Sequence, residues 1–247
     1  MDNNEFYSAI FKRKSIRKYK KEPLEQNKLE IIQDFIKKLV PLNADIKTEI
    51  VILSEEAIKV LLPIKAPHYL TFYSETKEDY LPNAGFMLQQ MDLFLSANGI
   101  GSCWLGLGVP KKETGSRNGL NFVITMAAGY ADEPLYRADV SEFKRNQLRE
   151  ISTLDREELL TAVRVAPSAS NTQPWYLSGS ADKIVISRKL PNFLKAALYG
   201  KFNQIDVGIA MCHLKISAEH MGKTLIFSKE NVEMPKGYEY NFTASLI

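Results

Sequence analysis

A short basic segment near the N-terminus carries the side chains best suited to hold an anion. Residues 12–21 read KRKSIRKYKK and contain seven basic residues and no acidic one. Within this segment Arg13 and Arg17 flank Ser15. Guanidinium groups match phosphate oxygens in a bidentate way, and a serine hydroxyl adds a neutral donor. Most basic runs are solvated turns, but a serine, an isoleucine and a tyrosine interrupt this one. It is therefore either a solvated turn or a phosphate site, and the interruptions favour a shaped pocket over a flexible tail.

A second segment, residues 166–175 (APSASNTQPW), combines hydroxyl and amide side chains ahead of a tryptophan. Asparagine and glutamine offer both donors and acceptors, so they suit a ring whose edge alternates carbonyl and N–H groups. The competing interpretation is a helix end with capping and Asx turns, because Ser, Asn and Pro interrupt regular structure. Spacing alone does not separate the two.

A third segment, residues 101–108 (GSCWLGLG), is rich in glycine and apolar side chains. Glycine lets the backbone approach a flat ligand closely, and leucine and tryptophan make an apolar wall. The alternative is a buried strand that needs small residues for packing, and the segment alone favours it. The glycine spacing matches neither the dinucleotide-binding pattern nor the P-loop pattern, so neither of those sites is supported.

No residues are spaced for metal binding or for nucleophilic catalysis. The three histidines, at positions 68, 213 and 220, are scattered, and no cluster has the spacing of metal ligands. The chain has no GxSxG motif. Its two cysteines, Cys103 and Cys212, are too few for a disulfide framework, and Cys103 lies in an apolar segment typical of a core residue. We therefore expect no metal and no catalytic triad or dyad.

The overall composition is that of an ordinary globular protein. Of 247 residues, 45% are hydrophobic and 25% are charged, and the net charge is +3. Because the basic segment contributes +7, the rest of the chain carries −4, which argues against nucleic-acid binding. No apolar run approaches the roughly 20 residues that span a bilayer, and the N-terminus is not a signal peptide. We expect a cytoplasmic protein that binds neither membrane nor nucleic acid.

The spacing of apolar residues predicts a mixture of helices and strands. Helices are expected over about 4–12, 29–39, 54–62, 82–99, 159–163 and 204–221. Strands are expected over 49–53, 68–73, 120–129, 176–178, 183–187 and 223–228. Residues 130–150 are polar and are predicted to form a long loop.

The two halves of the chain can be laid on each other. A shift of 123 residues places Gly85 on Gly208 and Gly99 on Gly222, so these glycines bracket the two long apolar helices at the same separation. A shift of 126 residues places Pro41 on Pro167, and each of these prolines ends an earlier helix. Helices and strands alternate in many folds, so coincidence is the alternative. The agreement of order and spacing over roughly 60 residues favours an internal duplication.

Together these segments resemble the FMN-dependent nitroreductase superfamily. Residues 13–17 (RKSIR) are similar to its N-terminal phosphate motif, residues 166–175 to its signature ending in QPW, and residues 101–107 to its segment along the flavin ring. Residues 143–145 (FKR) resemble its late basic pair near the phosphate. The QPW motif is the most specific, and the similarity covers residues 6–175 in scattered form. The resemblance implies an α+β fold, a nitroreductase-like three-layer α/β/α sandwich.

The distribution of these motifs departs from the ordinary members of that superfamily, in which one repeat carries all of them and FMN lies at a homodimer interface. Here residues 40–49 (VPLNADIKTE) stand in place of the QPW motif, and residues 221–227 (MGKTLIF) stand in place of the flavin segment. Each half keeps what the other lacks. The chain thus resembles the internally duplicated branch, which implies a monomeric pseudo-dimer with one site. The single domain, 1–247, would have pseudo-two-fold half-repeats of about 1–150 and 151–247.

The resemblance also assigns roles to residues by position. The FMN phosphate would be held by Arg13, Lys14, Ser15 and Arg17, with help from Arg145 or Lys144. The ribityl chain and the isoalloxazine ring would meet Pro167, Ser168, Ala169, Asn171 and Gln173. The ring would be lined by Trp104, Leu105 and Gly106, and the substrate side by Ser170.

The function implied is an FMN-dependent oxidoreductase. Hydride would pass from NADH or NADPH through the flavin to a nitroaromatic or quinone-like acceptor, by ping-pong exchange at one site. The flavin does the chemistry, so no acid–base side chain is required. The alternatives are a specialised member of the same fold that degrades flavin or removes halogen, and a flavin-binding protein without turnover. A nucleic-acid binder that uses the basic segment would instead show strongly salt-dependent binding and no colour.

Overall fold

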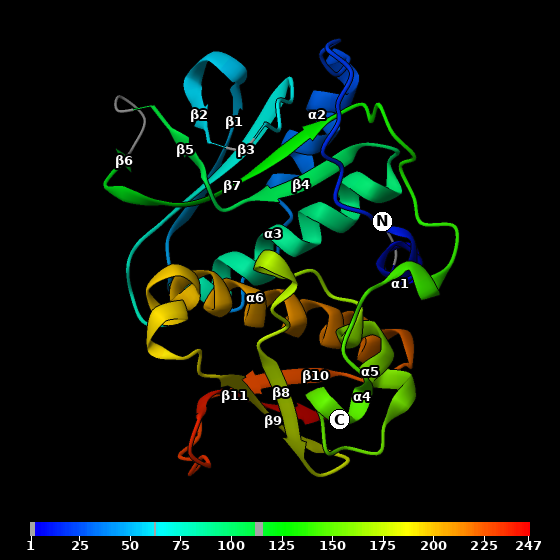
Figure 1. Ribbon diagram of the computed structural model, residues 1–247, viewed down its shortest axis with the longest axis vertical. Coiled ribbons are helices and arrows are strands. Elements are labelled where there is room, and N and C mark those ends of the chain that lie inside the picture. Colours follow the sequence, from blue (N-terminus) through cyan, green and yellow to red (C-terminus); the bar gives the residue numbers. More distant parts are fainter. Residues whose placement is uncertain (1–2, 62, 112–115) are drawn as a thin grey trace.

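Two long apolar helices form the centre of the molecule. In the computed structural model, which describes residues 3–61, 63–111 and 116–247, α3 (Tyr80–Ala97) and α6 (Phe193–His220) pack on each other between two antiparallel sheets (Figure 1). Almost every residue of α3 is buried. A helix that is apolar around its whole circumference belongs inside a protein, which explains its central position.

Each sheet covers one of the central helices. The sheet on α3 has the order β1 (Thr48–Ser54), β3 (His68–Ser74), β7 (Leu120–Gly129), β4 (Gly101–Leu105), with the short β6 (Ser116–Arg117) also paired to β7. The sheet on α6 has the order β10 (Leu225–Ser228), β11 (Tyr238–Leu246), β9 (Lys183–Lys189), β8 (Trp175–Gly179). A separate ribbon pairs β2 (Ile58–Val60) with β5 (Gly108–Pro110).

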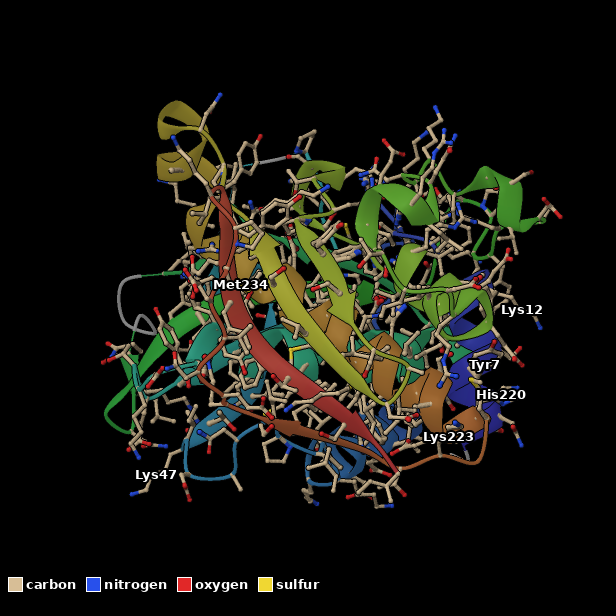
Figure 2. All side chains as sticks on the ribbon, turned by 90° about the horizontal axis from the view of Figure 1, so that it is seen from below. Tyr7, Lys12, Lys47, His220, Lys223 and Met234 are labelled. Atoms are coloured by element: carbon tan, nitrogen blue, oxygen red, sulfur yellow. The ribbon has the colours of Figure 1, made fainter. Side chains whose placement is uncertain are left out.

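Shorter helices pack around this centre. Their bounds are α1 (Asn3–Lys12), α2 (Gln26–Ile36), α4 (Leu148–Ile151) and α5 (Glu157–Arg164), with 3₁₀ turns η1 (Glu55–Ala57), η3 (Val140–Glu142) and η4 (Ala169–Asn171). Helix α1 packs against both central helices, and Tyr7 stacks on His220 with 3.8 Å between ring centroids (Figure 2). Phe35 of α2 stacks on Phe94 of α3 at 4.0 Å. Aromatic contacts of this kind join the N-terminal helices to both halves.

The two halves of the chain repeat one arrangement. When the short β2, β5 and β6 are left aside, two strands, a central helix and two more strands follow one another as β1, β3, α3, β4, β7 and again as β8, β9, α6, β10, β11. In the first sheet the last of these strands, β7, lies between β3 and β4. In the second sheet the last strand, β11, lies in the same way between β9 and β10. Both helices also end alike, because Gly99 and Gly222 have φ of 75° and 73° and carry the hydrogen bonds of the same cap. This is the arrangement that the expected duplication requires, and the duplication itself stays a prediction.

Helices α3 and α6 cross at two glycines, each of which touches the other helix's backbone. A Cβ atom on Gly85 would lie 2.0 Å from the carbonyl oxygen of Ile205, and one on Gly208 would lie 1.9 Å from that of Pro82. The same shift of 123 residues relates the two glycines and the two carbonyls, so the contact is reciprocal, as at a two-fold axis. No side chain larger than hydrogen fits at either position.

Most elements lie where the sequence predicts them. The mixed helix-and-sheet class is confirmed. The order of layers differs from the expected α/β/α sandwich, because the two long helices form the inner layers and a sheet lies outside each of them (Figure 1). The long helix expected over 204–221 begins earlier, at Phe193. The polar stretch 130–150 is mostly irregular, but it contains η3 and part of α4. Among the described helices, none is long and apolar enough to cross a membrane.

Two predictions of local structure are wrong. Residues 54–62 are predicted to be helical, but η1 and β2 occupy the part that the structure describes. Buried Ile58 alternates there with exposed Lys59, which is the period of a strand. Strand β11 is not predicted at all. Its register shifts between Tyr240 and Phe242, and such a bulge interrupts the alternation by which a strand is recognised.

Replacing Gly85 or Gly208 by alanine tests the helix crossing. We expect each substitution to lower the free energy of unfolding by about 3 kcal/mol or more, because the added methyl group forces two packed backbones apart. Gly200→Ala is the matched control on α6, since nothing lies within 4 Å of its Cβ position. We expect this control to gain up to about 1 kcal/mol from helix propensity. Urea denaturation measures all three variants, and wild-type stability of Gly85→Ala would contradict the crossing.

Candidate functional site

A cavity of about 310 Å³ lies between the two halves of the chain. The first half contributes Ser15, Arg17, Ile64, Cys103, Trp104, Gly106 and Ile124. The second half contributes Pro167, Ser168, Ala169, Ser170, Tyr199, Phe202, Ile205, Asp206 and Ile209. The volume is at the lower end of the range for small-molecule sites, and the lining is mostly apolar with a few polar groups, as such sites require.

The basic segment forms one wall because it lies along strand β4. The backbone N–H of Ile16 donates to the carbonyl of Ser102 at 2.9 Å, and Ile16 itself is fully buried. Its side chain lies against Gly101, where a Cβ would be 3.0 Å away. The buried isoleucine therefore fixes the segment in place and directs Ser15 and Arg17 to the cavity beside Trp104. This confirms a shaped wall and excludes a flexible basic tail.

Arg13 is held by a buried ion pair. Its Nε lies 2.8 Å from Oδ2 of Asp92 on α3, and the side chains are 1% and 0% exposed. Ser102 Oγ donates to the other carboxylate oxygen at 2.5 Å, and Gln89 Nε2 donates to Oδ2 at 3.1 Å. From this position Arg13 Nη2 donates to Ser15 Oγ at 3.1 Å. These contacts occupy both carboxylate oxygens of Asp92, while Arg13 Nε lies at ion-pair distance without hydrogen-bond geometry.

Two further arginines lie close to Arg13. Burial and the positive charge of Arg13 lower the pKa of Arg137 and of Arg145 to about 10, so both remain charged at neutral pH. The Arg137 guanidinium lies 3.9 Å from the ring centroid of Phe143 and donates to the Arg13 carbonyl. Arg145 donates through Nε to the Ala166 carbonyl at 3.0 Å. The guanidinium groups of Arg13, Arg137 and Arg145 therefore lie close enough to repel one another, and the excess positive charge favours an anion.

The opposite wall has a strained backbone. Ser170, Asn171 and Gln173 have φ of 50°, 57° and 47°, in the left-handed region that side chains other than glycine rarely adopt. Each such residue costs on the order of 1–3 kcal/mol and persists only where neighbouring contacts impose it, often at functional sites. Here Ser168 Oγ accepts from the Gln173 N–H at 3.0 Å, and Ala169 N–H donates to Asp206 Oδ1 at 3.0 Å.

The structure brings many of the predicted residues together in the cavity wall. Those that line it are Ser15, Arg17, Trp104, Gly106, Pro167, Ser168, Ala169 and Ser170. Arg13 and Arg145 lie behind this wall, where they position Ser15 and Asn171, and Lys14 Nζ donates to the Pro134 carbonyl at 3.2 Å. The side chain of Lys144 is exposed.

Three further predicted contacts, besides Arg13, Lys14, Lys144 and Arg145, do not line the cavity. Gln173 is buried, and its Oε1 accepts from the Asn146 N–H at 2.8 Å. Asn171 accepts from Arg145 Nη1 at 2.6 Å and donates to the Lys144 carbonyl at 2.8 Å. Leu105 packs in a separate small cluster with Ile58, Ile64 and Tyr69. Gln173 and Asn171 therefore hold the walls together through hydrogen bonds within the protein, and Leu105 contributes packing.

The sequence interpretation missed several residues of the site. Tyr199, Phe202 and Asp206 all come from α6, which is expected only as a core helix. The sequence did contain one indication of Asp206, namely an aspartate within a long apolar helix, because acids are almost never fully buried unless they are paired. Cys103 also lines the cavity, and burial raises the pKa of its thiol to about 11, so it is a neutral thiol rather than a nucleophile.

Comparison with known proteins relates this chain to nitroreductases. A family model described as "Putative TM nitroreductase" matches residues 5–218. A structure from Thermotoga maritima, described as a "putative nitroreductase", has a TM-score of 0.65 at 21% identity and covers 98% of this chain and 93% of its own. A match at this identity shows the fold. Among curated proteins, no match was found.

Other nitroreductase structures match about three fifths of the chain. A nitroreductase family protein from Clostridium difficile 630 has 17% identity and a TM-score of 0.46, and covers 59% of this chain and 94% of its own. A nitroreductase with bound FMN from Desulfitobacterium hafniense DCB-2 has 14% identity and a TM-score of 0.44, and covers 60% of this chain and 100% of its own.

Asp92→Asn tests the buried ion pair. We expect it to lower the free energy of unfolding by about 3 kcal/mol, because Arg13 then stays buried without a counter-charge. Asp34→Asn is the control, since it breaks an exposed pair with Lys37, and we expect no measurable change. Urea denaturation compares the two variants. If both unfold at the wild-type midpoint, the pair does not hold the basic segment.

Proposed function

The chain belongs to the family described as "Putative TM nitroreductase", and on that premise we propose that it is an FMN-dependent oxidoreductase that passes hydride from NADH or NADPH to a nitroaromatic or quinone-like acceptor. The observation that carries the proposal is the cavity between the halves. It has a cationic group of side chains at one wall and flat apolar side chains around it. A phosphate joined to a planar ring matches this arrangement, because its charge lies at one end and a flat, largely apolar surface at the other.

The cationic side of the cavity fits the phosphate of FMN. Arg17 and Ser15 line the cavity, and both are donors that suit phosphate oxygens. Arg13 orients Ser15 from behind, and Arg137 and Arg145 add positive charge that has little compensation from buried acids. We assign the phosphate to Ser15 and Arg17, with buried Arg13 and the half-buried Arg137 and Arg145 strengthening the field around them.

The apolar part of the cavity fits a flat ring. A Cβ on Gly106 would lie 3.0 Å from the ring of Phe202. The absence of a side chain at Gly106 therefore lets the turn after β4 approach the Phe202 ring closely. Trp104 also lines the cavity, and its Nε1–H is buried without a hydrogen-bond partner among the described residues. Such a donor is costly unless a ligand accepts from it.

The residues of this chain bind, orient and exclude water around the cofactor, and FMN supplies the two-electron chemistry when bound. Because the cavity is small, we propose that reductant and acceptor use it in turn, which is ping-pong exchange. Both walls come from one chain, so we propose a monomer with one site. Both cysteines are free and buried, which suits a reducing compartment such as the cytoplasm.

Arg17→Ala tests the phosphate assignment. We expect FMN to bind about tenfold more weakly or worse, since hydrogen bonds to charged groups are worth about 1.5–3 kcal/mol. Lys18→Ala removes the same charge from an exposed neighbour outside the cavity lining. This control should stay within about twofold of wild type at moderate salt. Quenching of FMN fluorescence on titration with flavin-free protein gives the FMN affinity of both variants. An equal loss of affinity in the two would contradict the assignment, because net charge alone would then explain it.

The stoichiometry of flavin tests the single-chain site. We expect one FMN for each 28.0 kDa chain, bound to a monomer, because each wall is supplied by the same chain. Light scattering after gel filtration gives the mass, and flavin absorbance of the same peak gives the ratio. Two flavins per chain, or loss of flavin when a dimer dissociates, would contradict the proposal.

A further inference from the structure

One buried carboxyl in the cavity wall is left with a free oxygen. Asp206 lies on α6 and is 3% exposed. Its Oδ1 accepts from the Ala169 N–H at 3.0 Å, while its Oδ2 is buried and has no hydrogen-bond partner among the described residues. The residue lines the cavity, so a ligand there can reach this carboxyl. A buried polar atom without a partner is costly, and this points to a ligand that completes it.

The other half of the chain shows what the position needs for structure alone. The shift of 123 residues that relates the two crossing glycines places Asn83 on Asp206. Asn83 Oδ1 accepts from the N–H groups of Leu42 and Asn43 at 2.7 and 3.1 Å, and so holds a loop as Asp206 holds Ala169. An amide therefore suffices for this task. The acid in the second half is not explained by the fold.

The surroundings of Asp206 favour its neutral form. Burial raises the pKa of Asp206 to about 8, against the opposing effects of the Ala169 N–H and of the nearby Thr172 hydroxyl, which donates its own hydrogen bond to Asn203 Oδ1 at 3.2 Å. The titratable groups that line the same cavity are Arg17, Cys103 and Tyr199. Of these, Arg17 is exposed and screened by solvent, and the Cys103 thiol is neutral because its own pKa is raised. No other acid lines the cavity among the described residues.

We propose that Asp206 carries a proton on Oδ2 and donates a hydrogen bond to an oxygen of the electron acceptor. This rests on the proposed function for the identity of the ligand, and it selects acceptors whose polar groups are carbonyl or nitro oxygens. Such oxygens accept hydrogen bonds and cannot donate them, so the neutral carboxyl attracts them and the carboxylate repels them. Asp206 is thus a specificity-determining residue that works only while it is protonated.

Binding of 4-nitrotoluene to flavin-loaded protein, without NADH or NADPH, tests this directly. The probe has no titratable group, so any pH dependence belongs to the protein. We compare wild type with Asp206→Asn at pH 6 and pH 10, on either side of the pKa of about 8. Wild-type affinity should fall about tenfold between the two, because a hydrogen bond is lost and a charge takes its place. Asp206→Asn keeps an acceptor for Ala169 and an N–H donor, so its affinity should change less than about twofold.

Thermal melting of flavin-free protein gives a readout that does not depend on FMN. Asp206 binds its proton more tightly in the folded than in the unfolded protein, so its contribution to stability falls as pH rises from about 4 to about 8. The melting temperature of wild type should therefore fall more over this range than that of Asp206→Asn. Asp34→Asn, an exposed acid on α2, is the matched control and should follow wild type.

The possible outcomes separate this inference from the proposed function. Equal pH dependence of nitrotoluene binding in wild type and Asp206→Asn overturns the role of Asp206, even where FMN binds as proposed. Failure to bind FMN overturns the proposed function. In that case tryptophan fluorescence measures nitrotoluene binding to the flavin-free protein, and the comparison of wild type with Asp206→Asn decides the inference.

Discussion

The reciprocal contact between α3 and α6 is the constraint on which the rest of the structure depends. Gly85 and Gly208 let the two helices touch backbone to backbone, and each of the two larger sheets lies on one of these helices. The contact therefore sets the distance between the halves. Ile205, whose carbonyl faces Gly85, also lines the cavity, as does the neighbouring Asp206. The width of the site is thus set by the closest packing in the molecule, where there is little freedom to adjust.

The positive charge at one wall of the site is organised around the buried carboxylate of Asp92. Asp92 fixes Arg13, and Arg13 in turn positions Ser15 and lowers the pKa of Arg137 and Arg145. One carboxylate does not neutralise three guanidinium groups, so the wall keeps a positive potential although Arg13 is buried and Arg137 and Arg145 are half-buried. A preformed field of this kind needs little reorganisation when an anion arrives.

The sequence predicts the central helices and the three segments of the site, because these depend on local spacing and residue type. It does not predict the partner of Arg13, since Asp92 is 79 positions away and only the fold brings the two together. For the same reason Asn171 and Gln173 are expected to meet a ligand, yet they join Arg145 and Asn146 across a loop. Strand β11 escapes prediction because its bulge disturbs the alternation of side chains. The sequence thus indicates which segments matter, and long-range pairing decides what each residue does.

Both sides of the helix crossing belong to one covalent chain, and this has a consequence for how the molecule can change. In a symmetric assembly of identical chains, every substitution appears on both sides of the axis at once, so a change that suits one side must be tolerated by the other. Here the two sides are independent positions. Asn83 keeps an amide while its counterpart at 206 is an acid, and each loop is held in the same way. In a single chain, one position can therefore keep a structural role while its counterpart takes a functional one.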